Sequence, residues 1–262
     1  MSRCHGPHWA RTFSAAATVC ALVTGLVPSA RSDVANGESM ARDQPAHAAV
    51  PTELFRAWNF DKQTEGEKPE GFTPYTLGGG SSAIWLVERD SGAPSVPNII
   101  RQSAPCSADP CFQMLIVDDL VYEYPDVTVR LRVAPTQGAT GEAGLVFAAR
   151  DRTTFYAATV DVSAKSVEVL QSVEGKIAVL ARSPVTVKNV PWHALRVRRN
   201  TIISKEYIEV FFDAVHILSI EEKAISSGQI GLVTRGSAMV AFDNLNAAPL
   251  YSQKPLSPPA AY

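Results

Sequence analysis

Apolar and polar residues alternate over long stretches of this chain. Between residues 127 and 133 every second residue is Val or Leu, and the residues between them are Thr and Arg. An extended strand points successive side chains to opposite faces, so this segment predicts a strand with one apolar and one charged face. Residues 207–212 alternate in the same way, but Phe211 falls on the otherwise polar face. That exception predicts a strand covered on both sides.

Short turn sequences separate the alternating segments. Glu174-Gly175 predicts a two-residue hairpin between strands at 166–173 and 176–181. Asp213-Ala214 predicts another tight turn, although Ala suits a positive φ less well than Gly does. Further strands are predicted at 58–61, 83–87, 99–102, 112–117, 144–149, 155–161, 192–199, 215–220, 229–234 and 239–245. Many short strands without a long helical period predict an all-β protein, a two-sheet antiparallel jelly-roll sandwich.

The two ends of the chain differ from this middle. Basic and histidine residues precede an apolar run from Phe13 to Val27, and small residues follow at Ser29, Ala30 and Ser32, which is the layout of a signal peptide. The run is short for a bilayer, which takes roughly 20 apolar residues, and an uncleaved anchor is the alternative. We therefore assign residues 1–30 to a signal peptide, 31–51 to a disordered leader, 52–248 to one β-sandwich domain and 249–262 to a Pro-rich disordered tail. The expected location is secreted or periplasmic, with no transmembrane segment after signal removal.

Composition excludes several classes of function. The formal net charge is −2 and no basic patch appears, so nucleic acid is not an expected partner. Only three histidines follow the first thirty residues, which argues against a multi-histidine metal site. Cys106 and Cys111 are the cysteines left after signal removal, and an even pair in an exported chain predicts a disulfide. The alternative, a metal or redox pair, lacks both C-x-x-C spacing and a nearby third ligand.

Several segments taken in order resemble a known superfamily. They are W-N-F-D at 58–61, I-W-L-V-E-R-D at 84–90, G-L-V-F-A-A-R-D at 144–151, W-H-A-L-R-V at 192–197 and the block 228–245 that ends in F-D-N-L. Together they resemble exported bacterial proteins of the concanavalin A-like lectin/glucanase superfamily, in particular its laminin G-like and 3-keto-disaccharide hydrolase-like (DUF1080-type) domains. The resemblance implies two curved sheets, with carbohydrate held on the concave one.

The resemblance also implies that the first and last strands pair. That pairing would bring Asp61 and Asp243 close together, and in related modules an aspartate of the closing strand helps to hold a structural calcium ion. Carboxylate oxygens suit this ion. The alternative is that both aspartates only accept hydrogen bonds from neighbouring turns.

The chain departs from the catalytic members of the superfamily. Glu88-Arg89-Asp90 begins like the E-x-D-x-x-E motif of laminarinase-type enzymes, but Ala93 stands where the last glutamate belongs. Retaining hydrolysis needs two carboxyl groups about 5 Å apart, and this strand does not supply them. Alanines at 148, 149, 157 and 158 stand where close relatives often carry polar residues. The sequence thus favours a non-catalytic carbohydrate-binding or surface-interaction domain. The alternatives are a glycoside-processing hydrolase and a structural envelope protein.

Five residues are candidates for contact with a sugar. The rings of Trp85 and Tyr156 could stack on a pyranose, although both types are also common in a sandwich core. Arg150 and Asp151 follow a strand and could bind hydroxyls, or form a solvated turn. Asp161 lies on the same side of its strand as Thr159, so we expect it to point into the groove of the concave sheet, where carbohydrate would be held. His193 could act as a base, but a packed, hydrogen-bonded histidine is the favoured interpretation.

Overall fold

The computed structural model describes residues 54–250 except 81, 105, 107, 135–140 and 238. The predicted signal peptide, the leader and almost all of the Pro-rich tail lie outside the described residues. Within the described part of the chain, no helix has the length and apolar character needed to cross a bilayer.

The described residues form β-strands joined by turns and loops. The strands are β1 (Arg56–Trp58), β2 (Phe72–Gly78), β3 (Trp85–Arg89), β4 (Asn98–Gln102), β5 (Cys111–Val117), β6 (Pro125–Val133), β7 (Gly141–Ala149), β8 (Phe155–Asp161), β9 (Ser166–Val173), β10 (Lys176–Pro184), β11 (His193–Ile202), β12 (Lys205–Phe212), β13 (Val215–Glu221), β14 (Gln229–Gly236) and β15 (Val240–Pro249).

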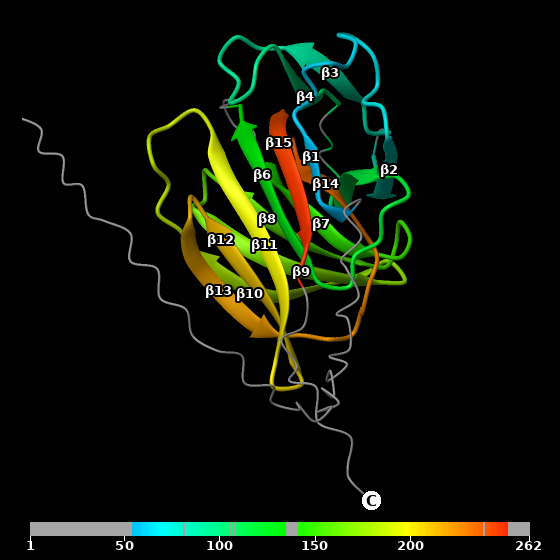
Figure 1. The fold of residues 1–262 in the computed structure, drawn as a ribbon, viewed down its shortest axis with the longest axis vertical. Coiled ribbons are helices and arrows are strands. Elements are labelled where there is room, and N and C mark those ends of the chain that lie inside the picture. The colour runs from blue at the N-terminus through cyan, green and yellow to red at the C-terminus, as the bar shows by residue number, and fades with distance from the viewer. Residues whose placement is uncertain are drawn as a thin grey trace, which may run out of the picture. The chain divides into compact units, whose positions relative to one another are not determined.

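The strands belong to two antiparallel sheets. Sheet I has the order β13-β12-β11-β6-β15-β4-β3, and β1 pairs with β15. Sheet II has the order β10-β9-β8-β7-β14-β5-β2. In Figure 1, β6, β11 and β15 of sheet I lie in front of β7 and β8 of sheet II. The predicted fold class, an all-β two-sheet antiparallel sandwich, is confirmed.

Tight hairpins connect neighbouring strands. Both predicted turns are present, with φ of 50° and 79° at Glu174-Gly175 and 48° and 67° at Asp213-Ala214. A third turn, Ile203-Ser204 between β11 and β12, has φ of 47° and 65° and was not predicted. Positive φ is unfavourable for a β-branched residue such as Ile203, so the local sequence does not predict this turn.

The two strands nearest the amino terminus of the domain differ from the prediction. β1 pairs at Arg56–Trp58, earlier than the predicted segment 58–61, with Trp58 opposite Leu245. β2 was not predicted, because Pro74 interrupts it and its apolar residues do not alternate. Since β2 is an edge strand, with β5 as its one neighbour in the sheet, a proline is tolerated there.

The main core lies between the sheets, where the alternating residues of β6 and β11 meet those of β7 and β8. Val129 and Leu195 from sheet I and Leu145 and Ala158 from sheet II are all fully buried in it. The prediction that β12 is covered on both sides is wrong. Phe211 lies on the outer face of sheet I, where the guanidinium groups of Arg196 and Arg198 each lie 5.4 Å from its ring centroid.

A second buried cluster lies on the outer face of sheet II, and none of its buried members is more than 5% exposed. Its members are Phe112, Met114, Ile116, Val146, Ala149, Phe155, Ala157, Leu170 and Val233. The rings of Phe112 on β5 and Phe155 on β8 are 5.8 Å apart, although β14 and β7 separate these strands. In a flat sheet the two strands would be about 14 Å apart. Sheet II therefore curls around this outer face, which is concave, and we call these residues the concave cluster.

Candidate functional site

Polar side chains occupy one end of the concave face, beside the concave cluster. They are Glu142 on β7, Thr159 on β8, Glu168 on β9, Arg182 on β10 and Arg235 on β14, and we call them the acid–base cluster. Strand register brings them together, because Arg235 lies opposite Glu142, and Glu168 lies opposite both Thr159 and Arg182. Alternation puts these positions on the same side of the sheet as the concave cluster.

Arg235 holds this cluster together. Its Nη1 donates to both carboxylate oxygens of Glu142, at 3.0 and 2.9 Å, and to Oε2 of Glu168 at 3.4 Å. The guanidinium carbon lies 4.8 Å from the ring centroid of Phe112, so the charged group rests on the concave cluster. The Thr159 hydroxyl donates to Glu142 Oε2 at 2.6 Å, and Arg182 pairs with Glu168. These bonds fix the charged groups in one arrangement.

A cavity of about 300 Å³ opens beside the acid–base cluster. Glu142, Asp161 and Arg235 line one part of it, and Ala108, Asp109 and Cys111 line another. The cavity is therefore a polar site whose walls come from segments far apart in the sequence.

The predicted disulfide between Cys106 and Cys111 is present and closes the loop that carries Asp109. The amide of Cys106 donates to the carbonyl of Gly236 at 3.1 Å, which ties this loop to the end of β14. A Cβ atom on Gly80 would lie 2.1 Å from the Cys106 sulfur, so only glycine fits beside the bridge. The disulfide thus places one wall of the cavity.

Of the five predicted sugar-contacting residues, Asp161 is the one that lines this cavity. Its position at the end of β8, opposite Glu142, follows from the strand register. One of its oxygens accepts the amide of Ala164 at 2.8 Å, so the side chain also caps the turn after β8.

The predictions for Trp85 and Tyr156 are corrected by the structure. Both rings lie in the core between the sheets, where Trp85 is 2% and Tyr156 0% exposed. Trp85 shares the inner face of β3 with Val87, and Tyr156 stacks on Phe147 with centroids 5.5 Å apart. A ring enclosed in this way offers no face to a sugar, so the core alternative holds for both.

Arg150 and Asp151 lie at the other end of β8 from Asp161, about 20 Å away along a seven-residue strand. The Asp151 carboxylate accepts the amide and hydroxyl of Thr153 and the amide of Thr154, and these bonds lower its pKa. This is the solvated-turn alternative, and it corrects the expectation that both residues face the same groove as Asp161.

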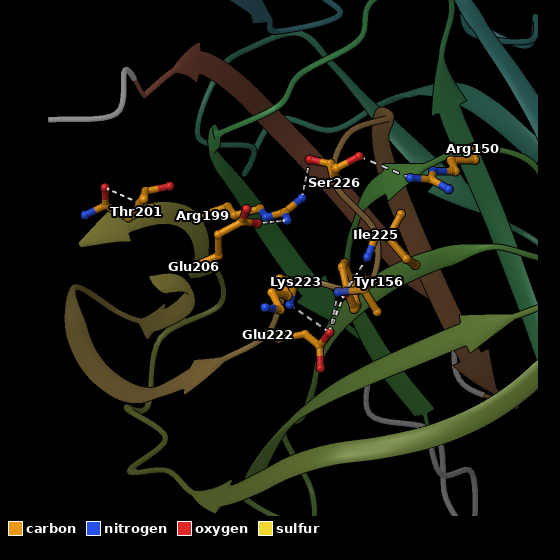
Figure 2. A network of polar contacts seen from close by, with 11 residues as sticks. Arg150, Tyr156, Arg199, Thr201, Glu206, Glu222, Lys223, Ile225 and Ser226 are labelled. Atoms are coloured by element: carbon orange, nitrogen blue, oxygen red, sulfur yellow. Dashed lines mark hydrogen bonds and ion pairs between the residues drawn. The ribbon is translucent and has the colours of Figure 1, made fainter. Parts of the chain in front are cut away.

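Arg150 and Tyr156 instead help to fasten the loop between β13 and β14 (Figure 2). Arg150 donates to the Ser226 hydroxyl at 3.1 Å. The Tyr156 hydroxyl donates to Glu222 at 2.8 Å and accepts the amide of Ile225 at 3.0 Å, and burial raises its pKa to about 12. Fully buried Arg199 pairs with Glu206 and donates to the carbonyl of Ser226. These residues form a structural network at the end remote from the cavity.

The structure brings Asp61 and Asp243 together, as the pairing of β1 with β15 implied. Asp61 accepts the Ser95 hydroxyl and the amide of Asn98 at 3.2 Å. Asp243 accepts the amides of Ser95 and Asn244, both at 2.7 Å. Burial raises the pKa of Asp243 to about 6, and the nearby Asp61 charge acts in the same direction.

These residues fit a calcium ion poorly. Calcium takes six to eight oxygen ligands, whereas all four oxygens of the two carboxylates already accept N–H or O–H groups. The described residues contain no cluster of three or more His, Cys, Asp or Glu side chains placed to hold a metal. The donor set therefore favours the hydrogen-bonded alternative.

His193 is packed, as favoured from the sequence. Its Nδ1 lies 2.8 Å from Oδ2 of Asp213, and its ring stacks on Phe212 with centroids 5.1 Å apart. The imidazole therefore orients the β12–β13 turn.

The sequence analysis missed Glu142, Glu168 and Arg235. One signal was available, because each is a charged residue that shares its side of a strand with a nearby apolar residue, which is Val146 for Glu142, Leu170 for Glu168 and Val233 for Arg235. That signal marks each residue separately and does not show that the three meet.

Comparisons with known proteins bear on the fold. No family model and no curated protein matches the chain. Among solved structures, carbohydrate-binding module CBM66 from Bacillus subtilis matches with a TM-score of 0.51 and 14% identity over 68% of this chain and 94% of that one. The Emp47p carbohydrate recognition domain matches with a TM-score of 0.51 and 10% identity over 78% of this chain and 100% of that one. The fold is that of the concanavalin A-like lectins and glucanases. At these identities the likeness concerns the fold alone, and it does not single out the laminin G-like or 3-keto-disaccharide hydrolase-like groups.

Proposed function

We propose that this protein is an exported, non-catalytic carbohydrate-binding domain that holds sugar hydroxyls in the cavity beside the acid–base cluster. The observation that carries the proposal is the meeting of Glu142, Asp161 and Arg235 around one cavity on the concave face. Two proteins with a similar fold are described as a carbohydrate-binding module and a carbohydrate recognition domain, which supports the choice of ligand class.

The chemistry of these side chains suits sugar hydroxyls. A hydroxyl both donates and accepts, so it can bridge a carboxylate and a guanidinium. The bonds to Glu142 and Glu168 engage a single nitrogen of Arg235, Nη1, and Asp161 uses one oxygen for its turn. The remaining donor and acceptor capacity is held in a fixed geometry, which reduces the entropy lost on binding.

The test is a glycan array with the full-length chain, followed by titration of the bound sugars. Asp161→Asn and Arg235→Lys should each weaken binding about tenfold, because charged hydrogen bonds are each worth roughly 1.5 kcal/mol or more. Arg198→Lys, on the outer face of sheet I, is the matched control and should leave binding unchanged. An array without any bound glycan would contradict the proposal and favour a structural envelope protein. Glycan binding that is unchanged in both variants would show that the glycan binds at another site.

One observation favours glycoside hydrolysis as a second candidate function. Because Arg235 Nη1 contacts Oε2 of both Glu142 and Glu168, these two oxygens are at most about 6 Å apart, near the separation used by glycosidases. Both carboxylates are paired with arginine, however, whereas an acid catalyst must carry a proton. Loss of measured hydrolysis in Glu142→Gln or Glu168→Gln would establish this alternative, and we expect no hydrolysis in the unmodified chain.

Export of the protein and calcium binding are also proposals. The amino-terminal sequence pattern supports export, and a disulfide agrees with an oxidising compartment. Calcium binding at Asp61 and Asp243 stays a prediction, with the hydrogen-bonded arrangement favoured.

A further inference from the structure

A second cavity, of about 730 Å³, lies at the other end of β5. Its walls include Arg56 and Trp58 of β1, Glu70, and Asp118 and Asp119 after β5. Val117 lines this cavity and Cys111 lines the first, so the length of β5, about 20 Å, separates the two. We call it the Trp58 cavity, and variants in it should not disturb the acid–base cluster.

The indole of Trp58 forms a fixed aromatic wall. It is partly exposed and meets Phe72 edge to face, with centroids 5.9 Å apart. Pairing of Trp58 with Leu245 fixes its backbone. The guanidinium of Arg56 lies 5.8 Å from the ring centroid, at the outer limit of a cation–π contact. The ring therefore presents a surface that already attracts a positive charge.

Acidic groups outnumber basic groups around this ring. Glu70, Asp118 and Asp119 line the cavity, and Arg56 is the one cation among the described lining residues. Asp118 accepts the Thr73 hydroxyl at 2.7 Å. Within the described part of the chain, no hydrogen bond or ion pair engages the carboxylates of Glu70 or Asp119. The potential inside the cavity is therefore negative.

Local hydrogen bonds hold the walls in place. The amide of Glu70 donates to the Gln63 side chain at 3.0 Å, and the amide of Asp118 donates to the carbonyl of Gly71 at 3.0 Å. The Tyr122 hydroxyl donates to the carbonyl of Leu54 at 2.8 Å. These bonds all join groups of the protein itself, so the fold holds the walls of the cavity in position.

We propose that the Trp58 cavity binds a sugar that carries a protonated amine. The sugar ring lies against the indole, and the ammonium group lies among the carboxylates of Glu70, Asp118 and Asp119. A neutral sugar would remove water from these carboxylates without supplying a charge in return. A small inorganic cation would leave the apolar wall of Leu54, Leu120 and Val121 without a partner. The inference rests on the proposed function only for the ligand class, since the site is separate.

The test uses β-1,4-linked glucosamine oligomers and the N-acetylated oligomers of the same length, titrated into the full-length chain. The pair differs in the charge and acetyl group of the amine, so the free amine should bind at least tenfold more tightly. The preference should shrink as salt is raised, because the carboxylates are near the surface. Equal affinity for the two series, or no binding of the amine series, would overturn the proposal.

Four variants locate the binding. Trp58→Ala should weaken binding of the amine series about tenfold, and the exposed changes Glu70→Gln and Asp119→Asn should each weaken it several-fold without affecting the fold. Arg56→Ala should strengthen binding of the amine series several-fold, because it removes the guanidinium group that competes for the Trp58 ring. Binding that none of these variants alters would overturn the assignment to this cavity. Loss of binding in Arg235→Lys but not in Trp58→Ala would assign the amine sugar to the first cavity and leave the proposed function intact.

Discussion

The outer faces of the two sheets are built from opposite kinds of side chain. On sheet I many outward residues are charged and paired across strands, as Arg196 is with Asp126 and Arg198 is with Glu209, and the buried apolar cluster there is small, with Ile99, Trp192 and Ala241 as its members. On sheet II they form the concave cluster, which is as buried as the core between the sheets. A sheet that curls brings its own side chains together, so its outer face becomes a second core without a covering layer. At one end of the concave cluster, polar groups of sheet II reach solvent. The candidate site lies at that end.

Removing a ring from the concave cluster is the largest expected perturbation. Phe155→Ala should lower the free energy of unfolding by about 3–5 kcal/mol, since it leaves a cavity among fully buried neighbours. Phe211→Ala on sheet I is the matched control and should cost less than about 1 kcal/mol, because that partly exposed ring packs only against the His216 ring and two guanidinium groups on the outer face. Urea unfolding measures both. Equal losses would show that the two outer faces do not differ as described.

Removing an arginine tests the charged groups of the two faces. Arg235→Ala should destabilise by about 2 kcal/mol, because Glu142 and Glu168 lose a shared partner and Glu168 is nearly buried. Arg198→Ala should cost below about 1 kcal/mol, because this side chain is 30% exposed and pairs with one carboxylate, that of Glu209. A double-mutant cycle with Glu142→Gln isolates the Arg235 contribution. Additive effects of the two substitutions would refute the role given to this arginine.

Asp243 is an exception on sheet I, since it is fully buried whereas the paired carboxylates of Asp126 and Glu209 stay partly exposed. Its pKa is raised to about 6 in the folded protein, so the folded state holds this proton more tightly than the unfolded chain does. The stability that Asp243 contributes is therefore complete below about pH 4 and is lost as the pH rises through 6. Melting temperatures measured across this range should fall less steeply in Asp243→Asn. An identical slope in the variant would contradict the assignment.

Chelation should have the smallest effect. Because the oxygens of Asp61 and Asp243 already accept hydrogen bonds, we expect the melting temperature to stay unchanged when EDTA is added. A lower melting temperature that calcium restores, and that Asp61→Asn abolishes, would instead establish the calcium site.

Sequence patterns anticipated much of the fold and little of the site. Strand positions, two of the tight turns and the disulfide could be predicted because each depends on residues close together in the chain. The proximity of Asp61 to Asp243 followed from a family resemblance. Trp85 and Tyr156 were candidates both for sugar stacking and for the core, because alternation separates two faces of a strand without saying which face is enclosed.

The sequence by itself determined where the chain is extended and which residues share a side of each strand, because the two-residue period of a strand is a local property. Tertiary structure decided which strands became neighbours and which sheet curled. Glu142, Glu168 and Arg235 meet only because β7, β9 and β14 join one sheet, and Arg235 lies 93 residues from Glu142 and 67 from Glu168. Pairing over such distances depends on the packing of the whole domain, which no local pattern contains.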